Sequence, residues 1–325
     1  MPINDPEKSE NMRKSIRVYS GSSNRPLAQK IAEYLGVELS GLTLKQFANG
    51  EIYARYDETV RGADVFLIQS VAGGNVNDML MELLIATDAA KRASARSITA
   101  VITHYGYARQ DRKDQPRVPI TAKLVANLLT AAGVDRVLTM DLHAAQIQGF
   151  FDIPVDHLYA APVLIRHLRE HYVKDLKKLV VVSPDVGGVK MARAYSDALG
   201  AELAIVAKHR VNATHVEAMN VIGDVEGRDA VLIDDMTETA GTLCAAANIL
   251  KERGAQRVFA CVSHGVLGDM ARERISGSCI ERVLTSDTVP MAYGPKVDCV
   301  SVGDLLGHAV QRIHDGESVS SLFDI

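Results

Sequence analysis

The sequence predicts an α/β protein made of two tandem domains of one fold, each with a mainly parallel sheet flanked by helices. Two observations lead to this prediction. Short apolar runs alternate with segments whose apolar residues recur at helical spacing, and several segments of the first half recur in order in the second half. Fully apolar strands that alternate with helices are typical of parallel sheets covered on both faces.

The repeat is visible in three long segments. RGADVFLIQS (61–70) matches EGRDAVLIDD (226–235), KRASARSITAVITHYG (91–106) matches KERGAQRVFACVSHG (251–265), and DRVLTMD (135–141) matches ERVLTSD (281–287). The start of the chain also has a counterpart in the second half. Five of its residues recur there in the same order, with Ala28, Leu35, Gly36, Glu38 and Leu39 matching Ala192, Leu199, Gly200, Glu202 and Leu203. An offset of roughly half the chain is too long for a solenoid repeat. It indicates two domains.

The expected strands fall in matching positions of the two halves. They are RVYSG (17–21), VFLIQ (65–69), ITAVIT (98–103) and RVLTMD (136–141), then LVVVSP (179–184), AVLIDD (230–235), VFACVS (258–263) and RVLTSD (282–287). Residues 77–93 have helical spacing, and another helix is expected to begin near Gly241. Ligands of such sheets bind in the loops that follow the carboxyl ends of strands.

These matches suggest the domain boundaries. We expect a loose N-terminal tail over residues 1–14, an N-terminal domain over 15–158, a C-terminal domain over 159–305, and a final segment, 306–325, that packs back on the N-terminal domain. The tail is polar and lacks the apolar core of a signal peptide.

The composition is that of an ordinary globular protein. The 325 residues are 47% hydrophobic and 23% charged, with a formal net charge of −4. No long basic run occurs, so neither nucleic acid nor an anionic membrane surface is expected as a partner. No apolar stretch reaches the ~18 residues of a membrane-spanning helix. The four cysteines form no CxxC pair, which suits reduced thiols in the cytoplasm.

The pair Asp234-Asp235 follows an apolar strand, and a loop with Thr239, Gly241 and Thr242 comes next. The matching strand of the first half ends in Gln69-Ser70, so the fold itself does not require the acids. Turn or helix-capping chemistry is the commoner explanation of acids in such a place. The loop that follows favours a second explanation.

A helix that begins at this loop would offer free backbone N–H groups and its dipole to an anion. The two acids would accept hydrogen bonds from sugar hydroxyls, directly or through Mg²⁺. A pentose phosphate satisfies both halves of the segment, with its phosphate on the Thr/Gly loop and its hydroxyls at the acids.

Other strand ends also carry charge. Segment 106–117 holds Arg109, Arg112, Lys113 and Arg117, which suits either an exposed loop or a polyphosphate site. Segment 140–157 holds a DxH pair that suits either a metal or a hydrogen-bonded histidine. Lys208 follows the strand 203–207. The pair of histidines in HLREH (167–171) is read as part of a solvated helix. No GxxxxGK[ST] or GxGxxG motif occurs, so neither a P-loop nor a dinucleotide redox role is expected.

Several long motifs resemble the ribose-phosphate pyrophosphokinase (PRPP synthetase) family, class I, over residues 15–325. They are YGYARQDRK, ITAKLVANLL, DLHAAQIQGFFDIPVDH, VVSPDVGG, IDDMTETAGT and GESVSSLF. VLIDDMTETAGT resembles the PRPP-binding loop of type I phosphoribosyltransferases. The resemblance implies two tandem phosphoribosyltransferase-like domains, in agreement with the repeat.

The resemblance also implies a reaction. The family transfers the β,γ-diphosphoryl group of ATP to O1 of ribose 5-phosphate, giving PRPP and AMP for nucleotide, histidine and tryptophan biosynthesis. It implies Mg²⁺ as cofactor, a cytoplasmic homohexamer, activation by phosphate and inhibition by ADP. An ATP site completed by a neighbouring subunit is part of the same expectation.

The resemblance assigns roles residue by residue. Ribose 5-phosphate is expected at Asp234, Asp235, Glu238, Thr239, Ala240, Gly241 and Thr242. ATP is expected at Phe47, Asn49, Glu51, Arg109, Gln110, Asp114 and His143. Metal contacts are expected at His143 and Asp185, with Asp141, Asp152 and Asp156 nearby. Lys208 and Arg210 are the expected catalytic cations. The effector site is expected at Thr59, Arg61, Arg117, Ser318, Ser320 and Phe323.

The sequence departs from the family pattern at three positions. Glu238 stands where the family usually has Asp, His209 where an Arg is common, and Thr59 where Ser is usual. Two alternatives to an active synthetase stay open, a non-catalytic regulatory paralogue and an ordinary phosphoribosyltransferase. The presence of Lys208 and Arg210 disfavours the first, and the second domain copy disfavours the second. We therefore expect activity.

Overall fold

The computed structural model describes residues 15–173, 175–210, 217–290 and 294–322, apart from the side chains of 208–210 and 217–219. The chain divides into two compact units. Unit 1 comprises Met1–Leu158, Thr288–Pro290 and Val302–Asp324, and unit 2 comprises Tyr159–Asp287, Met291–Ser301 and Ile325. Unit 1 therefore includes a stretch of chain that follows unit 2 in the sequence.

A five-stranded, fully parallel sheet forms the centre of unit 1, in the order β1-β4-β5-β6-β7. Its strands are β1 (Ile16–Ser20), β4 (Asp64–Ser70), β5 (Ser97–His104), β6 (Arg136–Met140) and β7 (Val155–Leu158). A separate antiparallel hairpin pairs β2 (Leu42–Gln46) with β3 (Ile52–Tyr56). β4 is buried along its whole length, as expected of a strand covered on both faces.

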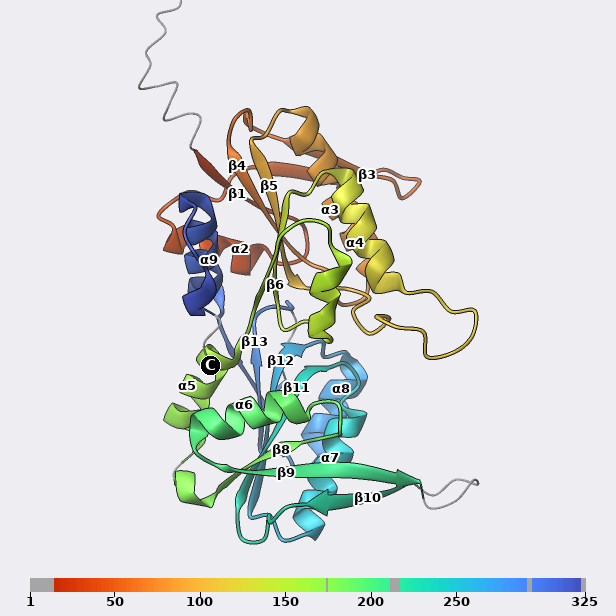
Figure 1. Cartoon of the computed structure of the whole chain (residues 1–325), viewed down its shortest axis with the longest axis vertical. Coiled ribbons are helices and arrows are strands. Elements are labelled where there is room, and N and C mark those ends of the chain that lie inside the picture. The colour runs from red at the N-terminus through yellow and green to blue at the C-terminus, as the bar shows by residue number, and fades with distance from the viewer. Residues whose placement is uncertain (1–14, 174, 211–216, 291–293, 323–325) are drawn as a thin grey trace, which may run out of the picture. The chain divides into compact units, whose positions relative to one another are not determined.

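Helices cover both faces of this sheet (Figure 1). The helical segments of unit 1 are α2 (Arg25–Tyr34), α3 (Val76–Arg92), α4 (Thr121–Ala132), η1 (Ala145–Phe150), α9 (Gly303–Asp315) and η3 (Ser320–Leu322). Leu83 of α3 and Val125 of α4 pack in one apolar cluster with Val65 and Leu67 of β4. α2 and α9 pack together on the other face.

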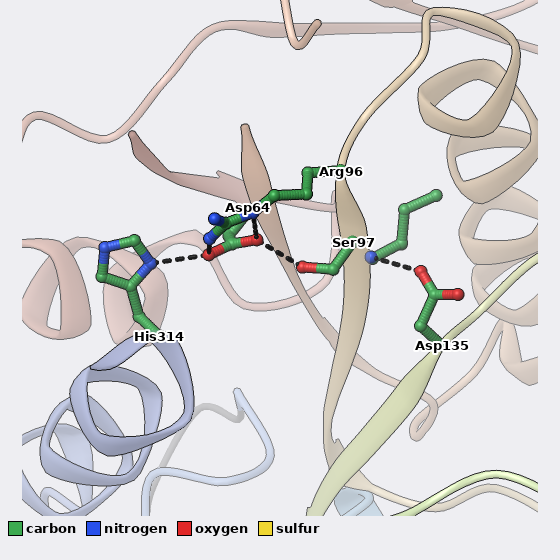
Figure 2. A network of polar contacts seen from close by, with 6 residues as sticks. Asp64, Arg96, Ser97, Asp135 and His314 are labelled. Atoms are coloured by element: carbon green, nitrogen blue, oxygen red, sulfur yellow. Dashed lines mark hydrogen bonds and ion pairs between the residues drawn. The ribbon is translucent and has the colours of Figure 1, made fainter. Parts of the chain in front are cut away.

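A polar network ties α9 to the start of β4 (Figure 2). The carboxylate of Asp64 accepts hydrogen bonds from Arg96 Nε at 2.7 Å, Ser97 Oγ at 2.6 Å and His314 Nδ1 at 2.7 Å. Burial would raise the pKa of Asp64, but the bonds from Arg96, Ser97 and His314 outweigh it and hold the pKa below its ordinary value. α9, which follows unit 2 in the sequence, is thus fastened to the rest of unit 1 by the buried carboxylate of Asp64.

A seven-stranded sheet forms the centre of unit 2, in the order β10-β9-β8-β11-β12-β13-β14. Its strands are β8 (Leu179–Ser183), β9 (Glu202–Arg210), β10 (Glu217–Ile222), β11 (Asp229–Thr237), β12 (Arg257–Gly265), β13 (Arg282–Ser286) and β14 (Val297–Val300). β10 runs antiparallel to β9, and the other described pairs are parallel. Its helical segments are α5 (Ala161–His171), η2 (Leu176–Lys178), α6 (Val189–Leu199), α7 (Gly241–Glu252) and α8 (Asp269–Gly277).

The two units repeat one topology. The order β1-β4-β5-β6-β7 of unit 1 recurs as β8-β11-β12-β13-β14 in unit 2. Fine detail recurs too, because the turn before β5 places Ser94 at φ 65° and the turn before β12 places Gly254 at φ 88°. The predicted fold class, two α/β domains with mainly parallel sheets, is confirmed. The predicted domain boundaries stay a prediction.

Candidate functional site

The two acids singled out in the sequence lie on β11 itself. The two acids close the expected strand AVLIDD (230–235), as the structure confirms, but the interpretation of the same acids as the start of a loop is wrong. β11 continues to Thr237, because its parallel pairing with β12 persists through Asp234 opposite Val262 and Met236 opposite His264. The two carboxyls therefore stand on a rigid strand end, half-buried, rather than on an adaptable loop.

A third acid joins them from the neighbouring strand. Asp185 follows β8, which pairs with β11. Its Oδ1 accepts the N–H of Gly188 at 3.0 Å, and Ser183 Oγ donates to its carbonyl oxygen at 2.7 Å. These bonds hold the short turn that carries Asp185 at the carboxyl end of the sheet, where ligands of parallel sheets bind.

Negative charge accumulates at this strand end. Burial raises the pKa of Asp234 to about 8, and the carboxylates of Asp235 and Asp185 add to the shift. Asp234 Oδ1 also accepts the N–H of Asp235 at 3.0 Å, which acts in the opposite direction. The raised pKa shows that the surroundings of Asp234 disfavour its charged form. A bound cation, or hydroxyl groups that donate hydrogen bonds to the carboxylate, would stabilise that charged form.

The predicted phosphate loop leads directly into a helix. α7 begins at Gly241, as the sequence predicted. Ala240 occupies the N-cap position at φ 55°, and no side chain caps the helix. A non-glycine residue in this left-handed region is strained by about 1–3 kcal/mol, and such residues cluster at functional sites. Glu238 and Thr239 are exposed, Ala240 is buried, and Gly241 and Thr242 are half-buried.

Arg274 contacts this loop and was not found from the sequence. Its Nη1 donates to the carbonyl oxygen of Thr239 at 3.0 Å. The residue lies on α8, 35 positions away along the chain. No spacing or motif in the sequence signals this contact.

The predicted catalytic cations lie at one end of a strand. Lys208 and Arg210 belong to the last part of β9, which pairs with β8. Their side chains lie outside the described part of the chain. β9 thus brings their backbone to the same sheet that carries Asp185 and Asp234, two strands apart from the latter.

In unit 1, three predicted ATP residues share one hairpin turn. Phe47 donates its N–H to the carbonyl oxygen of Glu51 at 2.8 Å, and Asn49 Oδ1 accepts the N–H of Glu51 at 3.2 Å. The turn between β2 and β3 needs Gly50, which has φ 90°. Phe47 is 56% exposed, a large fraction for a phenylalanine. The aromatic ring is therefore available to a flat partner such as a purine.

Other predicted ATP residues follow β5. Arg109, Gln110 and Asp114 are exposed in the segment that joins β5 to α4. Gln110 Oε1 accepts a hydrogen bond from Thr121 Oγ1 at 2.5 Å, which ties the segment to the first turn of α4. The three side chains therefore lie in the segment that follows the carboxyl end of β5, which suits either an exposed loop or a polyphosphate site.

Asp141 and His143 follow β6 at the same edge of the sheet. Asp141 is buried and has a φ of 38°. Its N–H donates to the carbonyl oxygen of Leu158 at 2.9 Å. His143, by contrast, is exposed. Between them, the N–H of Leu142 donates to His157 Nε2 at 2.9 Å. His157, which sequence reasoning missed, thus fastens the turn that carries the DxH pair.

The other two acids of the predicted metal set lie elsewhere. β7 runs parallel to β6, so its start lies at the amino edge of the sheet, opposite to His143. Asp156 stands near that start, and its carboxylate is paired with Arg136 Nη1 at 2.6 Å. Asp152 precedes β7 and is exposed at the same edge. Asp156 is thus engaged by Arg136, and the part of Asp152 and Asp156 in the metal set stays a prediction.

The described effector residues come from three segments of unit 1. Thr59 Oγ1 accepts the N–H of Arg61 at 3.3 Å. Ser318 Oγ donates to Ser320 Oγ at 2.9 Å, and Arg312 Nη1 donates to the carbonyl oxygen of Ser318 at 2.6 Å. Arg117 lies in the segment before α4 with φ 69°. Phe323 lies outside the described residues.

Within the part of the chain that is described, no group of three or more His, Cys, Asp or Glu side chains has a metal-binding arrangement. A metal held jointly by protein and substrate oxygens would not need such a group, because Mg²⁺ is usually bound by one or two carboxylates together with substrate phosphates and water.

None of the described helices has the length and apolar character needed to cross a membrane.

Comparison with known proteins gives the same picture over nearly the whole chain. Residues 16–133 match the N-terminal domain of ribose phosphate pyrophosphokinase, and residues 208–324 match the phosphoribosyl synthetase-associated domain. The ribose-phosphate pyrophosphokinase of Chlorobaculum tepidum is 53% identical over 315 residues, covering 96% of both chains. That of Gloeobacter violaceus is 53% identical over 312 residues, covering 95% of this chain and 93% of its own.

A solved structure agrees with the fold. The crystal structure of phosphoribosylpyrophosphate synthetase from Mycobacterium smegmatis superimposes with a TM-score of 0.88 at 41% identity. The match covers 93% of this chain and 99% of that one.

Proposed function

The chain belongs to the ribose-phosphate pyrophosphokinase family and produces PRPP for nucleotide biosynthesis, and from that premise we propose how its two units divide the work. Unit 2 binds ribose 5-phosphate, and unit 1 binds ATP. The observation that carries this division is the acidic end of β11, followed directly by the uncapped N-terminus of α7.

Ribose 5-phosphate fits the two halves of this segment. Its 5-phosphate sits on the backbone N–H groups and hydroxyls of Thr239 to Thr242, where the helix dipole favours an anion. The ribose hydroxyls donate to Asp234 and Asp235. Burial is the main cause of the raised pKa of Asp234, and hydrogen bonds from the ribose hydroxyls would favour its charged form and lower that pKa.

ATP is held by unit 1. The ring of Phe47 stacks on the adenine, with Asn49 and Glu51 of the same turn as polar partners. Arg109, Gln110 and Asp114 hold the polyphosphate with His143. An ATP site of this kind needs no P-loop, because separate cations and backbone donors neutralise the phosphates.

Mg²⁺ is the proposed cofactor, and the donor set suits it. One or two of the carboxyl groups of Asp185, Asp234 and Asp235 would supply the oxygens that this cation prefers, beside oxygens of the substrate. His143 and Asp141 are the proposed metal residues of unit 1. When bound, the ion neutralises phosphate oxygens during the transfer.

The chemical step is a displacement at phosphorus. O1 of ribose 5-phosphate forms a bond to the β-phosphorus of ATP, the bond from that phosphorus to the α,β-bridging oxygen breaks, and AMP leaves with that oxygen. The O1 proton passes to water. Lys208 and Arg210 stabilise the charge that develops on the transferred group, and such electrostatic stabilisation is the main contribution that a protein makes to phosphoryl transfer.

Regulation and assembly follow the same proposal. Phosphate activates and ADP inhibits at Thr59, Arg61, Arg117, Ser318, Ser320 and Phe323, within a cytoplasmic homohexamer. Residues 15–158 and 159–305 are the functional domains, and the segment from 306 belongs with the first. Rate against phosphate, with and without ADP at saturating ATP, tests this. A flat phosphate response together with full relief of ADP inhibition by ATP would contradict it.

The division of labour is tested by steady-state kinetics of AMP release with ribose 5-phosphate and ATP varied in turn. Thr242→Val removes a loop hydroxyl and should raise KM for ribose 5-phosphate about 10- to 100-fold, the size of one hydrogen bond to a charged group, with little change in KM for ATP. Equal changes in both constants would contradict the assignment.

A further inference from the structure

The phosphate loop lacks a cation of its own. Segment 234–242 contains Asp234, Asp235 and Glu238, and it contains no lysine or arginine. A phosphate monoester near neutral pH carries about two negative charges. Backbone N–H groups and a helix dipole supply partial charge only, equivalent to roughly half a unit. A dianion beside three acids therefore needs positive charge from another element.

Arg274 of α8 is placed to supply that charge. Its Nη1 lies 3.0 Å from the carbonyl oxygen of Thr239. The same Nη1 lies 3.3 Å from the point that a Cβ on Gly241 would occupy. The guanidinium thus stands against both ends of the Thr239–Gly241 peptide run, and its side chain is exposed to the solvent from which a ligand arrives.

The contact also acts on the shape of the loop. Between the two contacted residues, Ala240 has φ 55°, a conformation that tends to relax when neighbouring contacts are lost. The carbonyl of Ala240 is fixed by the N–H of Cys244 at 2.9 Å, inside α7. Arg274 fixes the preceding carbonyl, that of Thr239, toward α8. The strained residue is therefore held from both sides, and the N–H groups of the first turn of α7 remain available.

We propose that Arg274 is a positioning residue of the phosphate loop and the source of the positive charge that the loop's own sequence lacks. It specifies a doubly charged phosphate ester over a neutral or singly charged sugar. This inference rests on the proposed binding of ribose 5-phosphate to the loop.

The test compares three variants in the full chain by AMP-release kinetics and thermal unfolding. Arg274→Gln keeps a hydrogen-bond donor and removes the charge. Arg274→Lys keeps the charge. Arg272→Gln is the matched control, because Arg272 lies on the same helix, two residues away, and pairs with Asp269.

Arg274→Gln should raise KM for ribose 5-phosphate about five- to tenfold, the effect of one partly exposed charge near a helix N-terminus, while KM for ATP stays within about twofold. Arg274→Lys should recover most of this loss. The difference between the Gln variant and the unmodified enzyme should shrink in ~0.5 M salt, because screening weakens a charge interaction. Arg272→Gln should leave KM for ribose 5-phosphate unchanged.

Three results would overturn the inference. They are an unchanged KM for ribose 5-phosphate in Arg274→Gln, an equal rise in the Lys variant, and an equal rise in Arg272→Gln. Thr242→Val separates this failure from a failure of the proposed function. If Thr242→Val raises KM for ribose 5-phosphate and Arg274→Gln does not, only the role of Arg274 is wrong. If neither does, the substrate does not use this loop.

Discussion

Equivalent strands of the two units end in different chemistry. β4 of unit 1 ends in Gln69-Ser70, whereas β11 of unit 2 runs on through Asp234-Asp235. Gln69 is fully buried and hydrogen-bonded at both ends of its amide. Its Nε2 donates to Met79 O at 3.0 Å and to Glu82 Oε1 at 2.7 Å, and its Oε1 accepts Ser23 Oγ at 2.6 Å.

The loop after the first strand of each unit explains the difference. In unit 1 that loop closes over the end of β4, so tightly that a Cβ on Gly21 would lie 2.3 Å from Gln69 Oε1. Ser22 donates its N–H to Glu82 at 2.6 Å. In unit 2 the corresponding loop brings Asp185, which adds negative charge beside Asp234. One copy of the fold buries an amide network at its strand end, and the other places the carboxyl groups of Asp234, Asp235 and Asp185 there.

The hairpins differ as well. β2 and β3 form a sheet of their own in unit 1, but β9 and β10 extend the main sheet of unit 2. The end of β9, with Lys208, is therefore built into the sheet that carries the acids.

Lys208→Ala should cut turnover by on the order of 10²–10³, because a positioned cation on developing phosphoryl charge is worth a few kcal/mol. Ribose 5-phosphate binding should change little. Single-turnover rates and equilibrium binding distinguish the two effects. A loss of binding in proportion, with the single-turnover rate preserved, would make Lys208 a binding residue.

Asp235→Asn and its counterpart Ser70→Ala test the two strand ends directly. Asp235→Asn should lower kcat/KM for ribose 5-phosphate about 10- to 100-fold, since hydrogen bonds to a charged group are worth roughly 1.5–3 kcal/mol. The effect on KM for ATP should be smaller. Ser70→Ala should leave the kinetics unchanged, because among the described residues Ser70 Oγ has no hydrogen-bond partner. Equal effects of Asp235→Asn and Ser70→Ala on the kinetics would show that the two strand ends do not differ in function.

The opposite ends of the same strands offer a stability test. Asp64 pairs with Arg96, Ser97 and His314, whereas its counterpart Asp229 pairs with Arg257 Nε at 2.9 Å. Asp64→Asn should reduce the free energy of unfolding by about 2–4 kcal/mol, and Asp229→Asn by about 1–2 kcal/mol, because more donors lose a partner in the first case. Urea titration measures both. A larger loss for Asp229→Asn would contradict this ranking.

Acid weakens the contribution of Asp64 to stability. The folded-state pKa of Asp64 is lowered, so its contribution is present above its unfolded pKa and is lost as the pH falls through the folded value. The difference in unfolding free energy between the unmodified protein and Asp64→Asn should therefore shrink toward low pH. A difference that grows on acidification would show that Asp64 is not held as a charge.

In protein free of Mg²⁺, the contribution of Asp234 to stability should depend on pH in the opposite direction. Its folded-state pKa is raised to about 8, so the folded state binds the proton more tightly than the unfolded one. Its contribution to stability is fully present below the unfolded pKa and is lost as the pH rises through about 8. Asp234→Asn should raise Tm by roughly 2–5 °C at alkaline pH and by less near pH 4. An equal shift of Tm at both pH values would contradict this. Added Mg²⁺ should stabilise the unmodified protein more than Asp234→Asn.

Glu238→Asp has the smallest expected effect. It restores the residue most usual in the resembled family, and KM for ribose 5-phosphate should stay within about threefold or fall, because surface substitutions that keep charge change energies by roughly 0.5 kcal/mol. A marked rise would show that the longer side chain is fitted to its own loop.

Much of the fold was readable from the sequence because its signals are local. Apolar runs predicted the strands, the internal matches predicted two copies of one topology, and Gly241 marked the start of α7. The acids and the phosphate loop stood together in one short segment, so their chemistry was predictable as well. The length of β11 was not, because its last residues are held by pairing with β12 rather than by their own propensity.

Tertiary structure alone decided the contacts between distant residues. It put Asp156 beside Arg136 at the amino edge of the sheet, His157 beneath the turn of His143, and Arg274 against Thr239. It also joined His314 to Asp64, 250 residues away. Sequence patterns report which face of an element is buried, but charge pairing depends on which elements become neighbours, and that is settled only when the whole sheet has packed.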